Sequence, residues 1–95
     1  MAAAVDIGGL ISRRPEIRGG WPCIAGTGVS VARIAVLHNQ GLLPEEIIAD
    51  YPHLSLAQIH AALAYYYSNK AEVDGDLDAE ERLYDELARE SRRQP

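Results

Sequence analysis

The chain changes character abruptly at Val31, and this change most constrains its fold. The segment before it, from Pro15 onward, is rich in glycine and proline, whereas apolar residues recur at helical spacing after it. Gly19-Gly20 and Gly26-Thr27-Gly28 each predict a tight turn, because glycine takes positive φ at little steric cost. The short stretches 22–24 and 29–31 have the β-branched content of strands. We therefore expect a small β-hairpin over residues 22–31 that leads into a helical unit.

Three helices are predicted after the hairpin, over residues 31–40, 44–51 and 55–68. Gly41 stands where a left-handed C-cap belongs, and Pro44 suits the first position of the next helix. Ser55 and Gln58 have the spacing of a capping box. Because only residues 52–54 separate the second and third helices, we expect a helix-turn-helix whose core the first helix completes. The apolar stripes place these residues inside: Ile34, Leu37, Ile47, Ile48, Leu56, Ile59 and Leu63.

The domain organisation follows from the flanking segments. Residues 1–9 are predicted to be a flexible N-terminus, with a short strand at 10–12, and residues 10–69 to form the hairpin plus helix-turn-helix domain. Residues 70–95 read as an acidic linker followed by a C-terminal amphipathic helix or tail. Few apolar side chains lie in residues 77–93, so we expect this part to be poorly tied to the core when the chain is alone. The fold class is thus mainly α.

Composition limits the cellular setting and the kinds of partner. The formal net charge is −5, which is unusual for a dedicated nucleic-acid binder. Residues 70–95 carry nine acids and five bases, so most of the negative charge lies there. The single cysteine, Cys23, cannot form an internal disulfide, which favours a reducing cytoplasm. No basic, apolar leader and no segment of membrane-spanning length is visible, so we expect a cytoplasmic protein without a membrane partner.

No constellation of catalytic residues is visible, and we expect neither an enzyme nor a cofactor. Cys23 lacks a neighbouring base and reads as a buried, inert thiol. His38, His53 and His60 lie on different predicted elements and lack the spacing that places two imidazoles on one helical face. We therefore predict no catalytic residue and no metal site.

Two long stretches resemble a known bacterial family. The run Pro15-Glu-Ile-Arg-Gly-Gly-Trp-Pro-Cys-Ile-Ala-Gly-Thr-Gly-Val-Ser-Val31 and its continuation from Gly41 to Tyr67 are similar to domain-of-unknown-function family 433, over roughly residues 11–70. The sequence departs from that family's pattern at Gly28, where an arginine is usual, and at Leu43, where a small capping residue is usual. The resemblance implies a homeodomain-like helix-turn-helix behind a short hairpin. It also implies an antitoxin, of the kind often found beside a PIN-like nuclease toxin.

A helix-turn-helix normally points its second helix into the major groove of DNA. In this chain that helix carries a face of small residues, which suits close packing better than base readout. Self-association, by default as a dimer, is the favoured role of that face, and DNA-binding transcriptional regulation is the alternative. The candidates for self-association are Trp21, Ala57, Ala61, Ala64 and Ser68; for Trp21, a lid over the core is an equal alternative. The candidates for DNA binding are Arg13, Arg14, Arg18, Arg33, Gln58, His60 and Tyr65.

The C-terminal tail is the predicted site for a protein partner. Acidic amphipathic segments often order only when a partner buries their apolar side. By the family resemblance, that partner is a PIN-like nuclease toxin, whose carboxylate-lined site arginines of the tail would enter. A solvated helix is the alternative for the same residues. The candidates for partner binding are Arg82, Leu83, Tyr84, Leu87 and Arg89.

Overall fold

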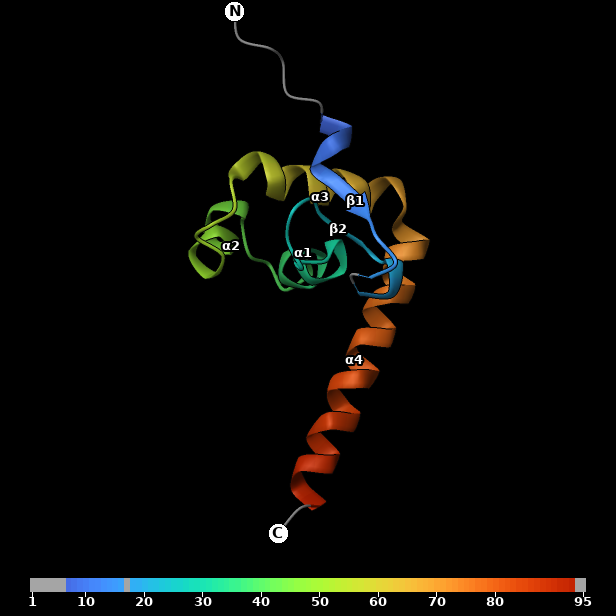
Figure 1. Ribbon diagram of the computed structural model, residues 1–95. Helices are drawn as coiled ribbons and strands as arrows, with labels where there is room; N and C mark the ends of the chain where they lie inside the picture. Colours follow the sequence, from blue (N-terminus) through green and yellow to red (C-terminus); the bar gives the residue numbers. More distant parts are fainter. Residues whose placement is uncertain (1–6, 17, 94–95) are drawn as a thin grey trace, which may run out of the picture.

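Helices dominate the structure, a computed structural model that describes residues 7–16 and 18–93 (Figure 1). The N-terminal part holds two short 3-10 helices and two strands: η1 (Ile7–Leu10), β1 (Ile11–Arg13), η2 (Arg18–Gly20) and β2 (Pro22–Ile24). Four α-helices follow: α1 (Val31–Asn39), α2 (Pro44–Asp50), α3 (Leu56–Ser68) and α4 (Lys70–Arg93). The predicted fold class, mainly α with an N-terminal hairpin, is confirmed.

The core lies between α1, α2, α3 and the first turns of α4. Ile34, Ile47 and Ile59 are fully buried at its centre, one from each of the first three helices. Leu37 and Leu63 are also buried, and Ile48 is partly buried against the cluster, so these predicted core positions are confirmed. The three predicted helix spans agree with α1, α2 and α3 to within one residue at each end.

Leu56 is the predicted core residue that the structure contradicts. Its side chain is 43% exposed, although it lies on the same helical stripe as the buried Ile59. Leu56 is the first residue of α3, and helical side chains lean toward the N-terminus of their helix. Its side chain therefore projects past the end of the core, while Leu54 and Ile59 are buried as expected of a hydrophobic staple.

The strand pairing differs from the predicted hairpin of residues 22–31. β2 pairs antiparallel with β1, in the register Ile11↔Ile24, and residue 30 makes only an isolated bridge to Cys23. The second predicted strand does not form, because Ser30 instead caps α1: its Oγ accepts a hydrogen bond from the backbone N–H of Arg33 at 3.0 Å. Thr27 closes the intervening turn, donating from Oγ1 to the carbonyl of Ile24 at 2.8 Å.

The helix ends of the core follow local sequence rules. Gly41 has φ of 95° and closes α1 in a Schellman arrangement, with its N–H donating to the carbonyl of His38 and the N–H of Leu42 donating to that of Leu37. At α3, Ser55 and Gln58 form the predicted capping box, with distances of 3.2 and 2.7 Å. These caps fix where α1 stops and where α3 begins.

The predicted acidic linker at the start of residues 70–95 is helical instead. Asn69 alone interrupts the path from α3 to α4, and α4 then runs unbroken from Lys70 through Gly75. Val73 and Leu77, one helical turn apart, are both buried in the core. Burial of these two side chains offsets the conformational entropy that the segment loses when it becomes helical. From the polar composition alone, this loss of entropy was expected to keep the segment poorly ordered. Consequently the first part of α4 belongs to the domain, and the predicted boundary at residue 69 is misplaced.

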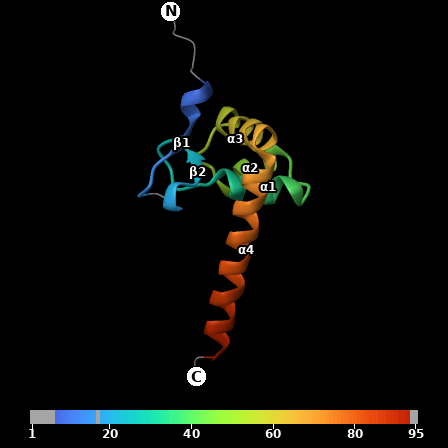
Figure 2. The ribbon, with the colours of Figure 1, turned by 90° about the vertical axis from the view of Figure 1, so that its right-hand side faces the viewer.

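The outer part of α4 leaves the body. Figures 1 and 2, two views at right angles, both show the C-terminal half of α4 extending away from the other elements. All described side chains from Glu81 to Ser91 are exposed. The molecule consequently measures 61 × 28 × 24 Å, and the long dimension is far greater than the other two.

Candidate interaction surfaces

The exposed half of α4 carries an apolar row. Leu83, Tyr84 and Leu87 are 53%, 56% and 50% exposed, which is unusual for three large apolar side chains within one turn. Tyr84 and Leu87 continue the stripe of the buried Val73 and Leu77, in steps of three and four residues. We call Leu83, Tyr84 and Leu87 the α4 face. The neighbouring candidates Arg82 and Arg89 are exposed, and Arg82 Nε donates to the carbonyl of Asp78 at 3.3 Å.

Sequence reasoning named these residues but missed their connection to the core. The signal was available in the spacing: from Val73, steps of four, three, four and three residues lead through Leu77, Glu80 and Tyr84 to Leu87. An uninterrupted stripe of that length indicates one helix rather than a linker and a tail. Glu80 is itself only 5% exposed, on the same stripe.

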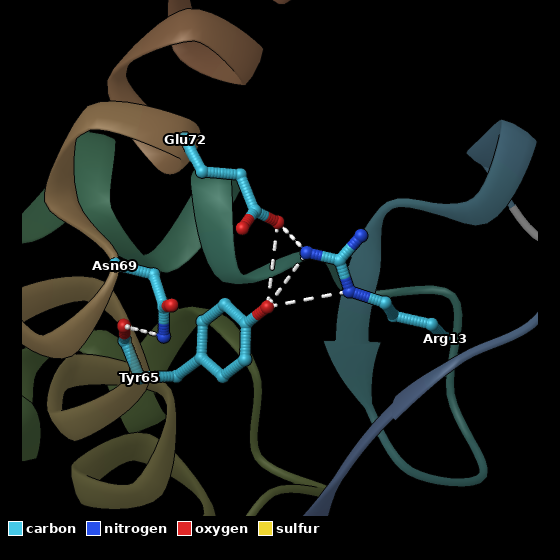
Figure 3. A network of polar contacts seen from close by, with 4 residues as sticks. All are labelled: Arg13, Tyr65, Asn69 and Glu72. Carbon is cyan, nitrogen blue, oxygen red and sulfur yellow. Dashed lines mark hydrogen bonds and ion pairs between the residues drawn. The ribbon is translucent and has the colours of Figure 1, made fainter.

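Arg13 and Tyr65, two DNA-binding candidates, contact each other. Figure 3 shows the Arg13 guanidinium beside the Tyr65 hydroxyl, with Nη2 at 2.7 Å and Nε at 3.3 Å, and paired with the Glu72 carboxylate. The Tyr65 hydroxyl also donates to Glu72 Oε1 at 3.3 Å, and Asn69 Nδ2 donates to the Tyr65 carbonyl. This network joins β1 to α3 and α4, so both candidates have a structural use.

The other DNA-binding candidates come from different parts of the fold, and two of them are engaged in contacts within the molecule. Arg33 Nε donates to the Tyr51 hydroxyl at 3.1 Å, and this bond raises the pKa of Arg33 above its ordinary value. Gln58 is occupied in the cap of α3. Arg14 and His60 are exposed on different elements. The side chain of Arg18 lies outside what the structure describes.

The small-residue face of α3 lies against the N-terminal turn of the chain. Ala61 is buried, while Ala57, Ala64 and Ser68 are exposed. η1 runs beside this face, and the two form an apolar groove of about 460 Å³. The groove is lined by Ile7, Leu10, Ala57, His60, Ala61 and Ala64. Ser68 lines a shallower hollow beside it, and Trp21 is half-buried elsewhere, at the start of β2. The chain thus covers part of its predicted self-association face with its own N-terminus.

A polar cluster around the buried Tyr66 escaped sequence reasoning. The Tyr66 side chain is 1% exposed, and its hydroxyl accepts from Asn39 Nδ2 at 3.1 Å and donates to Asp74 Oδ1 at 2.9 Å. Lys70 pairs with Asp74 at 3.1 Å. Its ammonium and then the Tyr66 hydroxyl lower the pKa of Asp74, while Asp74 raises the pKa of Lys70. The cluster fixes α4 against α1 and α3.

Two further polar features lie near these networks. His38 Nε2 lies 2.5 Å from the Tyr67 hydroxyl, and the two rings meet edge to face. Asp76, one turn beyond Glu72, is partly buried, and the loss of hydration raises its pKa. The His38–Tyr67 contact joins α1 to α3.

Two other classes of site lack support in the described part of the chain. Among the residues that the structure describes, no three His, Cys, Asp or Glu side chains gather as metal ligands would. Within the same part of the chain, no helix has the length and apolar character needed to cross a bilayer. Cys23 is buried in β2. The α4 face and the groove beside η1 are therefore the surfaces that the geometry singles out.

Comparison with known proteins identifies the family. Among curated proteins, no relative was detected. A solved structure, a DUF433 member protein from Anabaena variabilis ATCC 29413 at 2.00 Å resolution, superposes with a TM-score of 0.70. It is 28% identical in sequence, and the similarity covers 74% of this chain and 69% of that one. The model of the protein family of unknown function DUF433 matches residues 11–66, and the chain belongs to that family.

Proposed function

We propose that this chain is a non-enzymatic, antitoxin-like protein that self-associates and binds a nuclease toxin of the PIN-like type through the outer half of α4. The observation that carries the proposal is the α4 face: three large apolar side chains, each at least half exposed, on a helix that projects from the body. A face of this kind on a small domain marks an interaction site.

The helix itself supports a role in binding. Its inner turns are anchored by Val73 and Leu77, so the outer turns are presented on a fixed base. An amphipathic helix that lays its apolar row in a groove is a common mode of recognition. Arg82 and Arg89 are exposed on the other side of α4, where carboxylates of a partner that reaches around the helix can pair with them. Such pairs strengthen once the surrounding interface excludes water.

The nuclease partner follows from the family resemblance. A metal-dependent nuclease site is lined by carboxylates, and the guanidinium groups of the outer α4 have the complementary charge. Occupation of such a site by an arginine would block access of nucleic acid. The antitoxin role therefore needs no catalytic group in this chain.

The alternative, a DNA-binding regulator, has weaker support. The exposed face of α3 presents Ala57 and Ala64, which cannot read a base edge. Arg13, Arg33 and Tyr65 are engaged in contacts within the molecule. DNA binding would require these groups to exchange internal partners for phosphates.

Coexpression with the product of the adjacent gene tests the proposal. We expect a PIN-like nuclease to copurify with the full chain and to lose activity in the complex. Titration at nanomolar concentration should show that the double variant Leu83→Gln, Leu87→Gln binds at least about tenfold more weakly. The matched control, Asp85→Gln on the opposite side of α4 between Arg82 and Arg89, should bind no more weakly than the parent does. Absence of such a complex, or equal affinity for both variants, would refute the proposed role.

A further inference from the structure

The α4 face is an exposed apolar surface on a projecting helix. Leu83, Tyr84 and Leu87 lie on a part of α4 that no other element of the described chain covers. We infer that this face packs on the same face of a second copy, with the two α4 helices antiparallel. The inference deepens the proposed function, because the face proposed to bind the toxin would also bind a second copy of this chain. The role of the face in toxin binding rests on the proposed function, whereas the dimer can be tested without any other protein.

The spacing along α4 is that of a helix pair. Steps of four and three residues from Val73 to Leu87 form the seam of a coiled coil. The inner part of the seam is filled by the body, and the outer part is open. In an antiparallel alignment, Tyr84 of one copy lies opposite Leu87 of the other, and the reverse holds by symmetry. Leu83 lies beside these two Tyr84–Leu87 pairs.

The charges of α4 favour the antiparallel alignment. Residues 70–81 carry six acids and one base, a net of −5, whereas residues 82–93 carry four bases and three acids, a net of +1. Antiparallel pairing brings the basic C-terminal end of each helix to the acidic part of the other, where Asp78 and Glu81 are exposed. Parallel pairing would place the acidic halves side by side, which costs free energy.

The shape of the molecule also favours this alignment. The bodies lie at the N-terminal ends of the two α4 helices, so antiparallel overlap of the outer halves places them at opposite ends (Figure 1). One two-fold axis then closes the assembly without leaving a free copy of the face. Three large side chains from each copy make a small interface, and small interfaces are typical of weak association. We therefore expect a reversible dimer with dissociation in the micromolar range.

Sedimentation of the full chain tests the dimer. The parent should shift from monomer to dimer across the micromolar range, and the shift should weaken in high salt. Leu83→Gln with Leu87→Gln should raise the dissociation constant at least about tenfold. Asp85→Gln, which places the same side chain on the far side of α4, should leave the constant within about twofold of the parent. Unchanged circular dichroism and thermal unfolding in dilute samples establish that both variants fold.

Cysteine cross-linking tests the alignment in a Cys23→Ala background. Glu81 of one copy lies near Ala88 of the other in the antiparallel pair, so mixed Glu81→Cys and Ala88→Cys chains should form a disulfide. Neither variant should cross-link alone. Ser91→Cys tests the parallel alignment. Residue 91 lies on the seam, so two Ser91→Cys chains would form a disulfide if the helices were parallel. In the antiparallel pair the two residues 91 lie about 16 Å apart along the helix axis, which is too far for a disulfide.

Each contrary result overturns the inference. A monomer throughout the concentration range removes the dimer. A dimer that survives Leu83→Gln with Leu87→Gln assigns association to another surface, such as the groove beside η1. Ready cross-linking of Ser91→Cys chains establishes the parallel alignment instead. Toxin binding is measured at nanomolar concentration and dimerisation at micromolar concentration. The two proposals are therefore tested separately, and either one can fail without affecting the test of the other.

Discussion

At the scale of single residues, Leu43 is the clearest local departure from helix-capping rules. It occupies the N-cap of α2 with suitable backbone angles, yet its side chain is 61% exposed and makes no capping bond. Glu46 already accepts from the Leu43 N–H at 2.9 Å, which is half of a capping box. Leu43→Ser should complete the box and stabilise the protein by about 1 kcal/mol in urea unfolding. Leu43→Ala, which removes the apolar surface without supplying a cap, should bring no such gain.

Two glycines should respond to alanine in opposite ways. Gly41 has φ of 95°, a conformation that disfavours any Cβ, so Gly41→Ala should cost about 1 kcal/mol of unfolding free energy. Gly75 lies inside α4 with open space around its missing Cβ. Gly75→Ala should therefore stabilise by about 0.5–1 kcal/mol. Equal effects of the two substitutions in denaturant titrations would contradict this account of the C-cap.

Residues governed by their nearest neighbours in sequence were the most predictable. The caps at Gly41 and Ser55 were readable because glycine and serine at those positions satisfy backbone groups within a few residues. The exposure of Leu56 was not predictable, because it depends on where the core ends and not on the position of Leu56 in the apolar stripe of α3. The Arg13–Tyr65 contact was also out of reach, since 52 residues separate the pair.

At the scale of elements, α4 divides into an anchored and a projecting part. Removal of residues 82–95 should leave the thermal midpoint of a dilute sample nearly unchanged, because all described side chains from residue 81 onward are exposed. Removal of residues 70–95 should instead destabilise the domain by several kcal/mol, since it uncovers the core beside Val73 and Leu77. Circular dichroism melting compares the two truncations. A stable protein that ends at residue 69 would restore the linker interpretation.

Two carboxyls of α4 should affect stability with opposite signs. The folded pKa of Asp74 is lowered, so its contribution is complete above the unfolded value of about 4 and is lost as pH falls through the folded pKa. The folded pKa of Asp76 is raised by burial, so its charge opposes folding above that pKa and the effect vanishes in acid.

Asparagine substitutions separate these two effects. Asp74→Asn should lower stability near neutral pH and Asp76→Asn should raise it, and both differences from the parent should shrink as the pH falls through the folded pKa of each carboxyl. Urea unfolding at neutral and acid pH measures the differences. The same sign for both variants at neutral pH would contradict the assigned environments.

Some helices and strands could be predicted from their own local sequence, and others could not. α1, α2 and α3 were predicted because amphipathic stripes, caps and proline coincide at their bounds. The strand predicted at 10–12 agrees with β1 to within one residue, but the hairpin partner of β2 was placed at 29–31, because these residues resemble a strand locally while Ser30 is used to begin α1. The α4 face was identified from composition, but its fixed placement depends on burial of Val73, a residue that looked isolated in a polar stretch.

At the scale of the whole molecule, the projecting helix should dominate solution scattering. The radius of gyration is 14.9 Å, whereas a compact domain of this length has about 12 Å. The difference arises from the outer half of α4, which lies far from the centre of mass (Figure 2). Small-angle scattering of a dilute sample should therefore fall toward about 12 Å when residues 82–95 are removed.

Concentration adds a second test to the same measurement. An antiparallel dimer through α4 places the two bodies at opposite ends, so its radius of gyration should exceed that of the monomer strongly and its distance distribution should show two separated maxima. A dimer through the groove beside η1 would bring the bodies together and give one maximum. The variant Leu83→Gln with Leu87→Gln should retain the monomer profile up to concentrations at least about tenfold higher than the parent does. Scattering thus distinguishes the two surfaces by shape, and a compact dimer profile would exclude association through the α4 face.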